Sequence, residues 1–254
     1  MALSQGNRRA LTMYSFRNDY SEGAHPKVLQ ALADTNLRQT VGYGMDPCCQ
    51  AAADTIRRLC AAPDAAVHFL VGGTQVNLVT IDAFLQSYEA VVAAQTGHVS
   101  THETGAIEAT GHKVCTVESP DGKLTPALVE SVLAGHNGTE HMVLPRMVYI
   151  SDTTEIGTVY TKAELTALRQ CCDAHDLLLF LDGARLGSAL TSPENDLTLS
   201  DLAALTDVFT IGGTKNGALF GEAVIMTVPC DHFRWHIKQR GGMLAKGRLL
   251  GVQF

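Results

Sequence analysis

The sequence has few aromatic residues, few charges and no long apolar segment. Aromatic residues make up 6% of the 254 residues, with a single tryptophan, and charged residues make up 18%. No apolar run is long enough to span a bilayer, and no secretory signal is evident at the N-terminus. The net charge of −7 comes without a basic stripe, which argues against nucleic-acid binding. The composition therefore predicts a globular cytoplasmic protein that binds neither nucleic acid nor membrane.

Cysteine is present, but in no pattern that holds a disulfide framework or a metal ion. The seven cysteines are odd in number and include two adjacent pairs, Cys48-Cys49 and Cys171-Cys172. Because no C-x-x-C and no Cys/His ligand spacing occurs, no metal site is expected. Buried free thiols in a reducing compartment explain these residues best.

Apolar strands alternate with helical segments along most of the chain. Strands are expected at 66–71, 89–94, 113–117, 147–151, 177–182, 206–211 and 221–228. Several are apolar throughout, which is typical of parallel strands covered on both faces. The pattern predicts an α/β fold with three αβα layers and a mostly parallel sheet. The last strand follows its predecessor without room for a crossover helix, so it is expected to be antiparallel.

One large domain is expected from the length. We predict an N-terminal tail over residues 1–12, the large domain over 13–240, and the start of a further C-terminal region over 241–254.

Glycine and polar residues gather where the predicted strands end. Because carboxyl ends of parallel strands share one edge of a sheet, they mark the crevice where α/β proteins bind ligands. The residues at such ends are Gly72, Gly73, Thr74, His98, Asp152, Asp182 and Lys215.

Gly72 and Gly73 connect a buried strand directly to a helix. Such a turn lets a phosphate approach the backbone and meet the N–H groups of the helix N-terminus. The stretch is neither a dinucleotide G-x-G-x-x-G nor a Walker motif. A simple tight turn is an equally good interpretation of these two glycines.

Asp182 and Lys215 are the most informative pair. A pyridoxal phosphate (PLP) enzyme needs a lysine that forms a Schiff base with the cofactor aldehyde and an acid that pairs with the pyridinium nitrogen. Taken singly, Asp182 also suits a helix N-cap, and most lysines lie on the surface. The two together, each at a strand end, favour the cofactor interpretation.

Several short motifs occur in order along the chain. They are Arg17-Asn18-Asp19, Tyr43-Gly44-Met45-Asp46-Pro47, Gly73-Thr74-Gln75-Val76-Asn77, His98 with Glu103, Asp182-Gly183-Ala184-Arg185, Thr214-Lys215 and Gly241-Gly242-Met243. This set resembles the L-threonine aldolase and β-eliminating lyase family of fold-type I PLP enzymes. The resemblance implies the large domain of a PLP-dependent transferase-like fold, and it implies a small C-terminal domain that is missing beyond Phe254.

The resemblance assigns the cofactor-binding residues. Lys215 would hold PLP and Asp182 would pair with its ring nitrogen. Gly73, Thr74 and Gln75 would bind the phosphate. His98 and Arg185 complete the implied cofactor-binding set.

The resemblance also assigns residues to the substrate and to catalysis. Arg185 would bind the α-carboxylate through its planar guanidinium, although a structural ion pair is the alternative. Asn18 and Tyr43 would line the substrate end, or simply bond within their loops. His98 would stack on the cofactor ring and is the candidate base, with His102 as a competitor. Lys215, His98 and Asp182 form the implied catalytic set.

The implied reaction is cleavage of the Cα–Cβ bond of threonine or allo-threonine to glycine and acetaldehyde, in a homodimer or homotetramer. Thr154 stands where the family commonly has a histidine, so the identity of the base stays open. The alternatives are PLP-dependent β-elimination or transamination, and a non-catalytic fragment that retains PLP binding.

Overall fold

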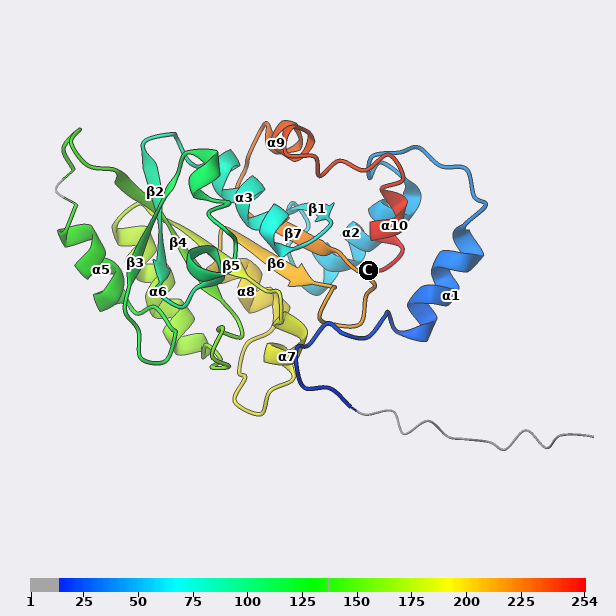
Figure 1. Ribbon diagram of the computed structural model, residues 1–254, viewed down its shortest axis with the longest axis horizontal. Coiled ribbons are helices and arrows are strands. Elements are labelled where there is room, and N and C mark those ends of the chain that lie inside the picture. The colour runs from blue at the N-terminus through cyan, green and yellow to red at the C-terminus, as the bar shows by residue number, and fades with distance from the viewer. Residues whose placement is uncertain (1–13, 137) are drawn as a thin grey trace, which may run out of the picture.

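A computed structural model describes residues 14–136 and 138–254; the predicted tail, residues 1–12, lies outside this part of the chain. Within the described residues, seven strands form one sheet in the order β1-β7-β6-β5-β4-β2-β3 (Figure 1). The strands are β1 (Ala66–Leu70), β2 (Glu89–Ala94), β3 (Lys113–Val117), β4 (Leu144–Ser151), β5 (Leu178–Asp182), β6 (Val208–Gly212) and β7 (Glu222–Met226).

Helices connect most of the strands. They are α1 (Pro26–Thr35), α2 (Pro47–Leu59), α3 (Gly73–Phe84), α4 (His98–Thr101), α5 (Pro126–Ala134), α6 (Lys162–Ala174), α7 (Leu186–Leu190), α8 (Leu199–Leu205), α9 (Phe233–Gln239) and α10 (Arg248–Gly251), with a 3-10 turn at Glu108–Thr110. Across the described residues, no helix has both the length and the apolar character that crossing a membrane requires.

The strand directions confirm the predicted mostly parallel sheet. Strands β3, β2, β4, β5 and β6 run parallel to one another. Strand β7 is antiparallel to β6, as expected, and it also pairs antiparallel with β1. Several predicted strand boundaries differ from the structure, most of all in β4, which begins at Leu144 and not at Met147. A register shift between Ala90 and Val91 of β2 accommodates Pro145 within the strand.

Two apolar clusters, one on each face of the sheet, make the three layers. One joins the sheet to α2, α5, α6, α7 and α8, and the other joins it to α3, α4 and α9. Side chains of β2 are buried along its whole length, because strands flank it on both sides and helices cover both faces. The three-layer αβα prediction is therefore confirmed.

Local capping explains where the longer helices begin. Asp46 accepts a hydrogen bond from the Cys49 N–H (2.9 Å), with Pro47 at the first helical position of α2. Thr161 and Glu164 form a capping box at the start of α6. Helix α3 differs, since Gly72 at its N-cap offers no side chain to its first N–H groups. Those groups stay available to a ligand.

The backbones at the carboxyl ends of β5 and β6 are in very close contact. A Cβ added at Gly183 would lie 2.0 Å from the Thr210 carbonyl oxygen, and one added at Gly212 would lie 2.5 Å from the Ala184 carbonyl oxygen. The Gly212 N–H donates to the Gly183 carbonyl (2.9 Å). Only glycine at both positions permits this approach, which brings the ends of β5 and β6 together.

Gly183→Ala is expected to destabilise the protein by about 3 kcal/mol, because the added methyl group overpacks a backbone-to-backbone contact. Urea unfolding would measure the loss. Gly23→Ala is the matched control, since a Cβ there meets nothing within 4 Å. Equal unfolding midpoints for the two variants would show that the backbone at the β5–β6 contact shifts to accept the methyl group with little loss of stability.

Candidate active site

A cavity of about 220 Å³ opens at the carboxyl edge of the parallel strands. It lies between the ends of β1, β4, β5 and β6 and the beginnings of α3, α4 and β7. The residues predicted from the sequence that line it are Gly72, Gly73, Thr74, His98, Asp182, Arg185 and Lys215. The structure therefore brings together most of the residues that the strand-end pattern and the motifs single out.

Asp182 is a buried carboxylate held by hydrogen bonds alone. Its Oδ2 accepts from the Tyr149 hydroxyl (2.6 Å) and from Asn77 Nδ2 (3.0 Å), and its Oδ1 accepts from the Ala184 N–H (2.9 Å). The residue is 5% exposed, and among the described residues no lysine, arginine or histidine forms an ion pair with it. A buried carboxylate in this position favours a ligand that brings a positive charge.

His98 is oriented from two sides at the start of α4. Its backbone N–H donates to Glu155 Oε1 (2.8 Å), and its ring Nδ1 lies 2.7 Å from Glu103 Oε1. That hydrogen bond, against the opposing effect of burial, raises the pKa of His98. With Nδ1 as the donor to Glu103, Nε2 is the ring nitrogen left to exchange a proton.

Asn77 connects these two groups. Its Nδ2 donates both to Glu103 Oε1 (2.7 Å) and to Asp182 Oδ2 (3.0 Å), and the residue is fully buried on α3. The histidine, its carboxylate partner and the strand-end acid therefore form one continuous network. Such a network fixes the side chains before any ligand arrives.

Lys215 follows β6 in a loop that is tied to the β5 turn. Asn216 Nδ2 donates to the carbonyls of Ala184 (3.1 Å) and Gly212 (2.8 Å). The Lys215 ammonium forms no ion pair with a described carboxylate, and it lies 6.0 Å from the centre of the Tyr20 ring. A half-buried lysine without an ion-pair partner is suited to react with a ligand aldehyde.

The glycine loop (residues 72–74) enters α3 beside this lysine. A Cβ added at Gly72 or Gly73 would meet nothing within 4 Å, so the backbone faces open space. The uncapped N-terminus of the 12-residue helix α3 begins at this point. Free N–H groups and the positive end of the helix dipole give the loop the properties of a phosphate site.

Arg185 lines the cavity but already has a partner. Its Nε and Nη2 donate to the two carboxylate oxygens of Asp19, at 2.5 Å and 3.2 Å. A guanidinium that holds one carboxylate with this fork geometry can hold another after Asp19 moves away.

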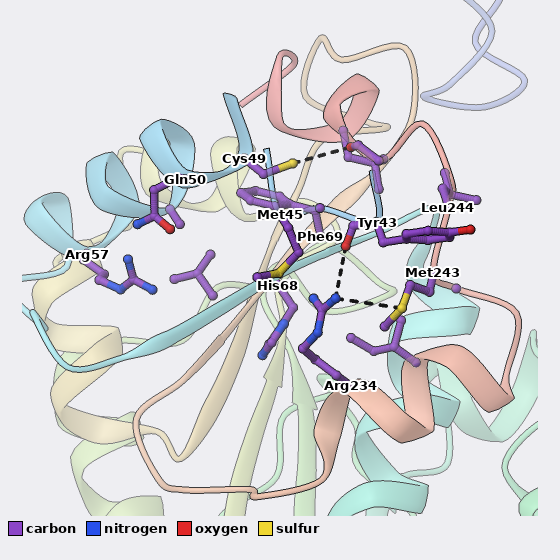
Figure 2. A pocket seen from close by; sticks show the side chains of 17 residues that line it. Tyr43, Met45, Cys49, Gln50, Arg57, His68, Phe69, Arg234, Met243 and Leu244 are labelled. Atoms are coloured by element: carbon purple, nitrogen blue, oxygen red, sulfur yellow. Dashed lines mark hydrogen bonds between the residues drawn. The ribbon is translucent and has the colours of Figure 1, made fainter. Parts of the chain in front are cut away.

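Gln75, Asn18, Asp152 and Tyr43 do not line this cavity, and neither does His102, the competing candidate base, which is exposed. Gln75 Nε2 donates to the Arg240 carbonyl (3.2 Å), and Asn18 Oδ1 accepts from the Tyr20 N–H (3.1 Å) within its own loop. Asp152 accepts from the Tyr160 N–H (3.4 Å) on the opposite face of the sheet. Tyr43 lies in a separate cavity of about 180 Å³, where Arg234 donates to its carbonyl (3.2 Å; Figure 2).

Several residues that build the site have no role predictable from the sequence pattern. Glu103 and Asn77 were visible only as parts of motifs. Tyr149 lies inside an apolar strand and gave no signal. Glu155 and Glu222 line the cavity and were not selected, although Glu155 stands beside the Thr154 position. Thr154 itself bonds to the Thr158 hydroxyl (2.6 Å) and does not line the cavity.

Comparison with known proteins decides the family. The beta-eliminating lyase family matches residues 16–252 of the chain. The chain belongs to the beta-eliminating lyase family. It is 36% identical to the low specificity L-threonine aldolase of Pseudomonas sp. (strain NCIMB 10558) over 244 residues, covering 93% of this chain and 69% of that protein. The corresponding Pseudomonas aeruginosa enzyme is 34% identical, with the same coverage.

Solved structures agree with this membership. A Leishmania major threonine aldolase superposes with a TM-score of 0.92 at 57% sequence identity, covering 95% of this chain and 71% of that one. A Thermus thermophilus aspartate aminotransferase shares the fold alone, with a TM-score of 0.71 at 15% identity. The expected cofactor class, PLP, is confirmed for a lyase of this family. The buried acid without a counter-cation, the unpaired lysine and the open glycine loop fit that cofactor.

Proposed function

We propose that the protein is a PLP-dependent aldolase that cleaves threonine and allo-threonine to glycine and acetaldehyde. The observation that carries this is the buried, uncompensated Asp182 in one cavity with Lys215 and the His98–Glu103 pair. The relatives named as threonine aldolases support the choice of substrate. Bound PLP supplies an electron sink for the pair of electrons released when a bond to Cα breaks.

The residues of this chain then have distinct roles toward the cofactor. Lys215 holds it covalently through Nζ, and Asp182 holds a proton at its ring nitrogen. The glycine loop and the first turn of α3 bind its phosphate with N–H groups. The Asn77 and Tyr149 hydrogen bonds keep Asp182 fixed while charge develops nearby.

Arg185 and His98 act on the substrate. Arg185 exchanges Asp19 for the α-carboxylate and thereby orients the amino acid. His98 takes the β-hydroxyl proton as the carbon–oxygen bond becomes a carbonyl and the Cα–Cβ bond breaks. Cα then gains a proton, and glycine and acetaldehyde leave. Glu103 supports this role by making His98 a stronger base.

The products test this proposal. The purified chain with PLP and L-threonine is expected to release acetaldehyde and glycine in equal amounts. β-Elimination, the second candidate because of the family to which the chain belongs, would instead give a keto acid and ammonia. PLP binding with neither product would identify a non-catalytic PLP-binding protein. The chain spans about 70% of the length of the Pseudomonas and Leishmania major threonine aldolases.

We also propose a cytoplasmic homodimer or homotetramer. Large apolar side chains are exposed near the start of the described chain, with Phe16 at 90%, Leu37 at 92% and Met45 at 63%. Such a surface favours association with a second copy. All seven cysteines are free, which fits a reducing compartment. Sedimentation as a 27.1 kDa species would contradict the oligomer.

A further inference from the structure

Glu222 occupies a central place in the candidate site. It begins β7, where it pairs with Leu70 at the end of β1 and with Gly212 at the end of β6. Leu70 is two residues before Gly72, the first residue of the glycine loop, and Gly212 is three residues before Lys215. Glu222 therefore stands between the proposed phosphate site and the proposed cofactor lysine, and it lines their common cavity.

Strand alternation directs its side chain toward the face of the sheet that α3 covers. Val224 and Met226 pack in the cluster that contains α3, whereas Ala223 and Ile225 pack in the opposite cluster. Since side chains alternate along a strand, Glu222 shares the α3 face with Val224. The residue is 4% exposed, so water contributes little to solvating its charge.

The surroundings of Glu222 favour its neutral form. Burial, reinforced by the negative charge of Asp182, raises its pKa to about 8 against the opposing effects of the Thr214 hydroxyl, Lys215 and the Gly213 N–H. The other charged or titratable groups that line the cavity are His98, Glu155 and Arg185. No described cation forms an ion pair with Glu222. At neutral pH this carboxyl group is a hydrogen-bond donor.

We propose that Glu222 is a positioning residue that donates a hydrogen bond, as a neutral acid, to the phosphate held at the glycine loop. An ionised carboxylate in the same half-enclosed space would repel the phosphate. The neutral acid removes that repulsion and adds a donor beside the N–H groups of α3. This inference rests on the proposed phosphate site and extends it to a residue on the other side of the cavity.

The sign of the pH dependence follows from proton linkage. Below pH 8 the acid carries its proton in both the free protein and the complex, so its titration does not change cofactor affinity. Above pH 8 the free protein has lost that proton, and binding must take it up again. Affinity for PLP should therefore fall about tenfold for each pH unit above 8, until the carboxyl group of the complex also titrates.

The test is the dissociation constant of PLP from pH 7 to 10 in the wild type and in Glu222→Gln. The amide has nearly the same shape, donates a hydrogen bond and never ionises. The variant is expected to match the wild type at pH 7 and to bind more tightly above pH 8, by about tenfold at pH 9. Pyridoxal, which lacks the phosphate, is the ligand control and should show no such difference between the two proteins.

Two results would overturn the proposal. One is a more than tenfold weaker binding of PLP by Glu222→Gln at pH 7, which would assign the ionised form to the wild type. The other is the same pH dependence in both proteins. If the variant does not fold, infrared difference spectra of the wild type at pH 9 decide, since PLP binding must convert a carboxylate band to a carboxylic acid band. A cofactor absorption band that borohydride reduction makes permanent at pH 7 tests the proposed function separately.

Discussion

Lys215→Ala is expected to abolish threonine cleavage, with a loss on the order of 10⁴-fold or more, as for other enzymes that lose the residue forming their covalent intermediate. Within the described residues, Lys215 is the lysine that lines the cavity with Asp182 and His98. Removing its amine leaves no group to hold the cofactor aldehyde. Acetaldehyde release and the visible absorption of the PLP-loaded protein, before and after borohydride reduction, would measure the effect.

Folding should survive this change. Lys215 forms no ion pair with a described carboxylate, and its contact with the Tyr20 ring is 6.0 Å long, so stability should change by no more than about 0.5 kcal/mol. Lys113→Ala, on the exposed side of the edge strand β3, is the matched control and should keep both the band and the activity. If the absorption band survives in Lys215→Ala and resists dialysis after reduction, a different lysine binds the cofactor.

The strand-end residues were predictable because parallel strands deliver their carboxyl ends to one edge of a sheet. Asp182, Lys215 and the glycine loop each follow a strand whose apolar character is evident in the sequence, and they meet in one cavity. The antiparallel β7 was predictable as well, since the chain between it and β6 is too short for a crossover. For these residues, the position at the end of a strand, which the sequence pattern shows, also fixes the position in the folded protein.

Other features depend on which face of a strand a residue occupies, which strand ends alone do not specify. Tyr149 lies on the α3 face of the sheet and donates to Asp182. Asp152 is three residues further along the chain, so strand alternation places it on the opposite face, where it accepts a hydrogen bond from the Tyr160 N–H. Glu222 is placed by its pairing with both β1 and β6, which requires the strand order of the whole sheet. Tyr43 lines a different cavity of its own chain, a separation that only the folded structure reveals.

Asp182→Asn is expected to lower kcat on the order of 10²- to 10³-fold, with a smaller effect on KM, because a neutral amide cannot hold a positive charge at the ring nitrogen as bonds break. Single-turnover cleavage of threonine would measure the chemical step. The pH dependence of the cofactor absorption band would report the proton at the ring nitrogen independently of turnover.

The donors around Asp182 determine the orientation of the side-chain amide in Asp182→Asn. Both groups at Oδ2, the Tyr149 hydroxyl and Asn77 Nδ2, are donors, so the amide oxygen must take that position. The NH₂ group then faces the Ala184 N–H in place of the acceptor that Asp182 Oδ1 provides. One buried donor loses its partner, and stability should fall by about 1 to 3 kcal/mol.

Tyr149→Phe distinguishes the negative charge of Asp182 from the hydrogen bonds that hold this side chain in place. It removes one hydrogen bond to Asp182 and leaves the carboxylate, so it should cost much less activity than Asp182→Asn. If the two variants lose activity equally, the network and not the negative charge is what catalysis requires. If Asp182→Asn keeps activity within tenfold of the wild type, the buried carboxylate has no role at the ring nitrogen. Charge complementarity would then no longer support the cofactor's proposed orientation in this cavity.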